Sequence, residues 1–288
     1  MTTTTAPATS TLSGVSFGGI LRSEWIKLRS LRSTIWCYAI MVVVTIGFGV
    51  LFAAAASVMF QGVPEGVVPD DQQSTLVLVA TVGISFSQLI AIILGALTIT
   101  GEYGTGMIRS TFAAVPKRLP ALFGKALVFA IVTFVVSFVA IALTALFGQP
   151  ILAANGIPTN LADATLWLTL AGGAAYVALI GLFGMAIGAI IRNSAGSIAA
   201  ALAVVLVLPT ILQIFAGVTQ AAWAVNIMTF LPSNAGTIMY TYPTDEAPFN
   251  PYNFDPIVLE TWQGGIVVVI WVAVLLVLAS VLLKRRDA

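Results

Sequence analysis

The side chains that could carry out chemistry in this 288-residue sequence are few. The sequence has no histidine, a single cysteine, Cys37, and 12 basic and 11 acidic residues. Clusters of His and Cys that bind metals, Cys–His nucleophiles and disulfides within the chain are therefore excluded. A serine nucleophile would lack a histidine base, and no G-x-x-x-x-G-K-[ST] phosphate loop is present. We expect no catalytic residue, cofactor or metal ion, and any ATP hydrolysis must take place on a separate subunit.

The segment TITGEYGTGMIRSTFAAVPKRLPALFGK, residues 98–125, contains the most unusual pattern of charged and apolar residues. We predict a short docking helix that begins near Thr100 or Gly101, with Glu102 in its first turn, where a negative charge is favourable. An apolar stripe of Met107, Ile108 and Phe112 follows. The alternative interpretation is an interfacial elbow with anchoring bases.

A second segment, GVSFGGILRSEWIKLRSLRS, combines apolar and basic residues near the N-terminus. On a helix, one face would hold Phe17, Leu21, Trp25 and Leu28, and the basic residues Arg22, Lys27 and Arg29 would lie off it. This pattern is typical of a helix that lies along a membrane surface. It is also compatible with ordinary basic flanking of a first membrane span.

The long segment 219–261 is apolar in its first half but is interrupted by Asn226, Pro232 and Asn234. It fits a pair of re-entrant half-helices, which membranes tolerate only where protein covers the irregular backbone or a cavity adjoins it. An amphipathic loop with an aromatic belt is the alternative.

Gly184 and Gly188 form a G-x-x-x-G pair within an apolar stretch. Such pairs permit close approach of two helices. We expect this packing to lie inside one subunit, with a subunit interface as the alternative.

These segments must be positioned by membrane-spanning helices. Hydrophobic residues make up 59% of the sequence, charged residues only 8%, and the mean hydropathy is +1.04, whereas soluble domains average about 25% charged residues. A span needs about 20 apolar residues, and six stretches qualify, near residues 35–58, 76–100, 121–147, 165–191, 197–218 and 262–283. We predict an all-α integral membrane protein with a disordered tail over residues 1–14 and a single six-span domain over 15–288.

The charges are segregated between the two sides of these spans. All 12 basic residues and three acids, Glu24, Glu102 and Asp287, fall on one side, giving 12 − 3 = +9; the other side has 0 − 8 = −8. The positive-inside rule then predicts both termini in the cytoplasm of a cell membrane. No charged residue falls near the middle of a span, which disfavours a proton-relay carrier or a voltage sensor.

Taken in order along the chain, four segments resemble the permease subunits of ABC-2-type exporters: LRSEWIKLRSLRSTIW, TGEYGTGMIRSTFAAVPKR, FLPSNAG and the basic tail LLKRRDA. The resemblance covers nearly the whole chain from about Gly14. It implies a permease that forms the translocation pathway, pairs with a second permease copy in the surrounding lipids and docks onto a cytoplasmic ATPase; no nucleic-acid partner is expected. The residues expected to couple permease and ATPase are Glu102, Tyr103, Met107, Ile108, Arg109 and Phe112.

Two other function classes stay open from the sequence. One is a self-contained channel or secondary carrier, which would move its substrate without an ATPase. The other is a membrane-embedded resistance or signalling partner that binds a ligand without translocating it.

Overall fold

The computed structural model describes residues 16–59, 72–107, 118–244 and 254–285, and all regular secondary structure in this part of the chain is helical, without a strand. Six helical stretches are long and apolar enough to cross a membrane, which confirms the predicted fold class. They comprise α2 (Arg32–Met59), α3 (Gln72–Thr81) with α4 (Ile84–Gly104), α6 (Arg118–Ala154), α7 (Ala164–Ile191), α8 (Ser194–Leu202) with η1 (Ala203–Val207) and α9 (Leu208–Thr219), and α12 (Thr261–Arg285).

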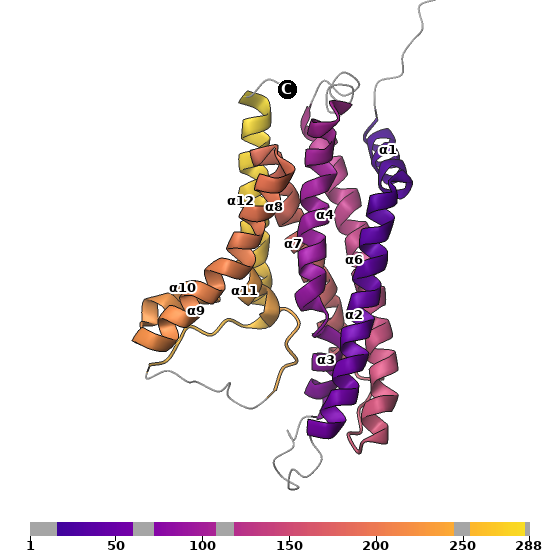
Figure 1. Ribbon diagram of the computed structural model, residues 1–288, viewed down its shortest axis with the longest axis vertical. Helices are drawn as coiled ribbons and strands as arrows, with labels where there is room; N and C mark the ends of the chain where they lie inside the picture. Colours follow the sequence, from indigo (N-terminus) through magenta and orange to yellow (C-terminus); the bar gives the residue numbers. More distant parts are fainter. Residues whose placement is uncertain (1–15, 60–71, 108–117, 245–253, 286–288) are drawn as a thin grey trace, which may run out of the picture.

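Three shorter helices complete the described part of the chain: α1 (Phe17–Ser30) precedes the first span, and α10 (Ala222–Thr229) and α11 (Pro232–Ile238) lie between the fifth and sixth spans. The start of α1 and the end of α12 lie at the same end of the molecule (Figure 1). We call this the basic end, because it carries Arg22, Lys27, Lys125 and Lys284. The opposite end, with Asp163 at the start of α7, is the acidic end.

Helix α7 is the centre of the fold. It packs against α3, α4, α6, α8, α11 and α12, and 72% of its most apolar window is buried inside the chain. Glycines allow α4 to approach closely: a Cβ on Gly184 would collide with the carbonyl oxygen of Ile92, and one on Gly188 would lie 3.1 Å from that of Ala96. The structure thus places the G-x-x-x-G pair against a helix of the same chain.

Two spans are interrupted, which the hydropathy pattern did not predict. The second span breaks at Val82–Gly83, where a Cβ on Gly83 would lie 2.6 Å from the Cα atom of Thr45 on α2. The fifth span contains the π-helical turn η1 just before Pro209. A proline ring cannot fit an unperturbed α-helical turn, and a π-helical turn relieves that conflict.

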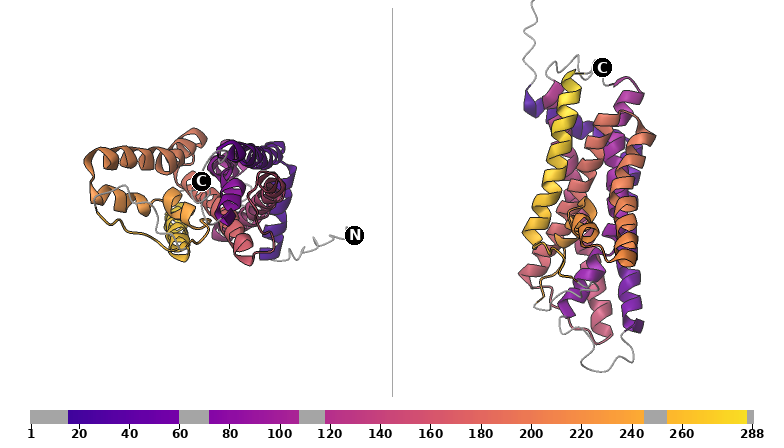
Figure 2. Two further views of the ribbon diagram at one scale, coloured as in Figure 1. Left: turned by 90° about the horizontal axis from the view of Figure 1, so that it is seen from below. Right: turned by 90° about the vertical axis from the view of Figure 1, so that its left-hand side faces the viewer.

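The segment after the fifth span forms α10 and α11, two half-helices too short to cross a membrane. Pro232 is buried at the first position of α11, and the chain covers this helix with α7 and α12. The indole nitrogen of Trp271 on α12 donates a hydrogen bond to the carbonyl of Phe230, 2.9 Å away. Figure 2 shows α9 and α10 projecting beside the remaining bundle.

At the acidic end, the elements are joined by hydrogen bonds. Two of these link neutral groups, and one links a phenol to a carboxylate. Gln73 at the start of α3 donates to the carbonyl of Asn160 at 2.8 Å and accepts from its backbone N–H at 2.9 Å. The phenol of Tyr242 donates to Asp163 at 2.7 Å. This bond and the backbone N–H of Thr165 hold the pKa of Asp163 below its usual value.

Candidate functional site

The first element of the candidate site is α1, which docks on α6. Ser16 caps the helix by accepting from the N–H of Gly19 at 3.1 Å, and the helix ends at Leu31, whose backbone is extended. Ile20 is buried where Gly124 leaves space: a Cβ on Gly124 would lie 2.7 Å from the Cγ2 atom of Ile20. Glu24, one turn later, is buried as well. The face of α1 that packs on α6 therefore includes a charged side chain.

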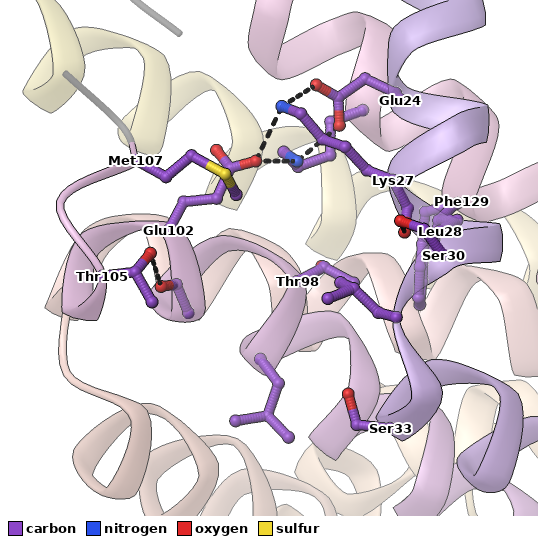
Figure 3. A pocket seen from close by; sticks show the side chains of 14 residues that line it. Glu24, Lys27, Leu28, Ser30, Ser33, Thr98, Glu102, Thr105, Met107 and Phe129 are labelled. Carbon is purple, nitrogen blue, oxygen red and sulfur yellow. Dashed lines mark hydrogen bonds and ion pairs between the residues drawn. The ribbon is translucent and has the colours of Figure 1, made fainter. Parts of the chain in front are cut away.

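Glu24 belongs to a cluster of four alternating charges, the ionic cluster, formed by Glu24 and Lys27 of α1, Glu102 of α4 and Lys125 of α6. The Lys125 ammonium lies 2.6 Å from Glu24 and 2.8 Å from Glu102, and the Lys27 ammonium lies 2.7 Å from Glu24 and 3.0 Å from Glu102. Both bonds to Glu102 use its Oε1 atom (Figure 3). The cluster is neutral overall, so its charges compensate each other where water is scarce.

The four side chains differ in burial. Both carboxylates and Lys125 are at most 10% exposed, whereas Lys27 is 28% exposed. Burial opposes protonation of Lys27, but the hydrogen bonds and charges of Glu24 and Glu102 outweigh it and raise its pKa above the ordinary 10.5. Lys27 therefore stays charged at physiological pH.

The end of α4 is also attached to the turn between α7 and α8. Arg192 in this turn adopts a left-handed backbone conformation (φ 60°), and its guanidinium lies 5.0 Å from the ring centre of Tyr103. The hydroxyl of Ser194 donates to that of Thr100 at 2.9 Å. The last turn of α4 thus contacts α1 and α6 through Glu102, and the α7–α8 turn through Tyr103.

This arrangement corrects the expected helix start at Thr100 or Gly101. Helix α4 continues through both residues to Gly104, so Glu102 lies in the last turn of a span and not in the first turn of a new helix. The physical reason is that no proline interrupts this stretch, and the hydroxyl of Thr100 donates to the carbonyl of Ala96 one turn earlier at 2.9 Å instead of capping a new helix. Met107 is 40% exposed just after α4, while Ile108, Arg109 and Phe112 lie outside the described residues.

The structure distributes the other predicted residues between surface and interior. Arg22, Trp25 and Arg29 are exposed on α1, whereas Lys27, expected with the two arginines off the apolar face, turns into the ionic cluster. Asn234, in α11, is half-buried and its Oδ1 atom is 3.3 Å from the hydroxyl of Ser233.

Sequence reasoning missed Glu24 and Lys125 as site residues. Glu24 is an acid within a basic segment, and Lys125 lies among apolar residues near the start of a span. Burying either charge without a partner is energetically unfavourable. A charged residue in such surroundings therefore indicates that an oppositely charged partner lies nearby in the fold.

The six spans are typical of an integral membrane protein, and a comparison with family models identifies its class. Residues 19–288 match the model of the ABC-2 family transporter protein, and the chain belongs to this family. It is the membrane permease subunit of an ABC transporter. A comparison with curated proteins gave no match.

Proposed function

We propose that this chain is the membrane half of an ABC exporter, that its basic end faces the cytoplasm, and that the ionic cluster couples it to a separate ATPase subunit. One observation carries the proposal: Glu102, within the segment 98–125 that we predict to dock, forms ion pairs with two lysines from two other helices. A displacement of that segment would reach α1 and α6 directly through Glu102, and the α7–α8 turn through Tyr103.

The orientation is supported by the charge segregation of +9 against −8 described above, which follows the positive-inside rule. Both termini would then be cytoplasmic, in a cell membrane. Single cysteines introduced into a Cys37→Ser background test this. A cysteine at Ser30 should react with a membrane-impermeant maleimide only in inside-out vesicles, and one at Asn160 only in right-side-out vesicles.

A second permease copy would pack against the exposed face of the fifth span. Only 17% of its most apolar window is buried within the chain, the lowest value of the six spans, and Ile211, Ile214 and Val218 are all more than half exposed. This face would meet either lipid or another permease. Disulfide cross-linking of an Ile211→Cys variant in membranes distinguishes the two, because only a second copy yields a covalent dimer.

The first test of the proposal is purification of the tagged chain from its native membranes in mild detergent, with mass spectrometry of what accompanies it. We expect a soluble ATPase in stoichiometric amount. Its reproducible absence would favour a self-contained channel or carrier, and substrate flux in liposomes containing this chain alone would establish that alternative. Tight ligand binding without flux would favour the resistance or signalling partner.

A second test separates docking from coupling. Met107→Asp and Ile108→Asp should reduce the recovered ATPase by about tenfold or more, since each places a charge in the proposed apolar contact. The matched control is Ile257→Asp, at an exposed position far along the chain from the segment; it should leave recovery unchanged. Glu102→Gln should retain the ATPase but reduce the response of ATP hydrolysis to reconstitution in lipid. Unchanged recovery in both docking variants would refute the docking role.

A further inference from the structure

A cavity of about 390 Å³ lies between the first two helices and the end of α4, against the ionic cluster (Figure 3). Its volume is typical of a small-molecule pocket and far exceeds what one water molecule needs. The four charged residues of the ionic cluster all contribute to its lining. The remaining wall is mainly apolar and includes Leu28, Leu31, Leu97 and Phe129.

The polar wall has an unfilled acceptor. Oε1 of Glu102 accepts from both lysines, but Oε2 is buried and has no hydrogen-bond partner among the described residues. The Glu102 side chain is only 5% exposed, and leaving a buried carboxylate oxygen unpaired is unfavourable. Met107 lines the same cavity (Figure 3). Its unbranched side chain adjusts readily to a ligand.

The same wall has an available donor. The Lys27 ammonium has three N–H groups, of which two are used by Glu24 and Glu102. Because Lys27 is 28% exposed, its third N–H can reach a ligand. A ligand that matches both groups carries an N–H donor for Glu102 and an anionic oxygen for Lys27.

The rest of the cavity offers few polar groups to a ligand. The hydroxyls of Ser30, Thr98 and Thr105 donate to the carbonyls of Lys27, Gly95 and Gly101 in their own helices, at 3.0, 2.7 and 2.9 Å. Three of the four hydroxyls in this wall thus have occupied donors, with Ser33 as the fourth, and an apolar chain is the ligand portion that the mainly apolar space suits. Leu31 and Leu97 are 48% and 37% exposed at the ends of membrane spans, so the cavity borders the level where a lipid headgroup meets its acyl chains.

We propose that this cavity binds a membrane phospholipid whose headgroup carries a primary ammonium, an ethanolamine phospholipid. The ammonium would donate to Oε2 of Glu102, the phosphate would accept from Lys27, and part of an acyl chain would occupy the space beside Leu97 and Phe129. A choline headgroup has no N–H to donate, and a glycerol headgroup has no positive charge. The site rests on the cavity alone and does not depend on the proposed ATPase.

The test is native mass spectrometry of the delipidated full-length chain, titrated with ethanolamine, choline and glycerol phospholipids of identical acyl chains. We expect one ethanolamine lipid to bind at least about tenfold more tightly than the choline lipid, because a hydrogen bond to a charged group has that effect on binding. Equal binding of the two lipids by the wild-type chain would overturn the headgroup assignment without any variant being needed.

Variants locate the site. Leu97→Trp fills the cavity without changing the ionic cluster, and it should reduce ethanolamine-lipid binding about tenfold or more. The matched control is Leu127→Trp, an exposed leucine on α6 outside the cavity lining, which should bind as the wild type does. Glu102→Gln should bind both lipids with similar affinity. Ethanolamine-lipid binding that persists in a folded Leu97→Trp chain would place the lipid elsewhere and overturn the proposal.

Discussion

The two ends of this permease are joined by different chemistry. At the basic end, four buried or half-buried charges of α1, α4 and α6 contact each other in the ionic cluster. At the acidic end, the Gln73–Asn160 and Tyr242–Asp163 contacts involve few charges, and the Gln73–Asn160 pair is exposed. Removing one partner from a buried ionic group leaves an uncompensated charge, whereas water replaces an exposed hydrogen bond. The basic end should therefore resist separation much more strongly than the acidic end.

The largest effect is expected for Lys125→Met. This change leaves Glu24 and Glu102 with only the half-exposed Lys27 between them, and we expect the free energy of unfolding to fall by roughly 3–5 kcal/mol. Unfolding in detergent, followed by intrinsic fluorescence during an SDS titration, measures this loss. Lys284→Met, at an exposed position on α12, is the control and should lie within about 0.5 kcal/mol of the wild type.

A double variant sharpens this result. Adding Glu24→Gln to Lys125→Met removes one of the uncompensated carboxylates, so the double variant should be less destabilised than the sum of the two single variants. Strict additivity would show that these side chains do not interact as a cluster.

A smaller effect is expected for Lys27→Met within the same cluster. Lys27 is more exposed than Lys125, and water can partly solvate the carboxylates that it leaves. We expect a loss of about 1.5–3 kcal/mol, together with faster proteolysis within α1, which limited trypsin digestion can follow. A loss as large as that of Lys125→Met would contradict the ranking by burial.

The acidic end should respond least among the substitutions. Gln73→Ala removes two exposed hydrogen bonds to Asn160, and we expect the free energy of unfolding to change by no more than about 1.5 kcal/mol. The same SDS titration measures it. If Gln73→Ala equalled Lys125→Met in effect, the contrast between the two ends would be wrong.

The smallest expected effect is that of alkaline pH on the basic end. The pKa of Lys27 is raised in the folded chain, so its stabilising contribution is fully present below the ordinary 10.5 and is lost as the pH rises through the folded value. The difference in thermal midpoint between the wild type and Lys27→Met should be constant at neutral pH and shrink only above about pH 10.5. A difference that shrinks near pH 8 would contradict the raised pKa.

Much of the fold could be predicted from the sequence, because span length and apolarity are local properties. The six predicted spans match the six helical stretches, with ends that differ by up to seven residues. The interruption at Val82–Gly83 was not predictable in this way. It depends on the contact of Gly83 with Thr45 on α2, and no local pattern encodes a contact between different spans.

The candidate site was predictable only in part. Glu102 and Lys27 were chosen for other reasons, one as a helix start and the other as part of a surface face. Lys125 was missed because it is 101 residues from Glu24 in sequence, and Glu24, three residues from Lys27, because it stands in a basic segment. A charge in apolar surroundings indicates that a partner exists, but only the fold shows which residue it is.

The close packing of α4 on α7 has a mechanical consequence. With glycines at the contact, the two backbones approach each other directly, and few flexible side chains lie between them to absorb a displacement. The 21 residues of α4 extend over about 30 Å. A displacement of Glu102 would thus be transmitted along the whole length of α4. The rigid stretch ends at the break at Val82–Gly83, where α3 can change its angle to α4.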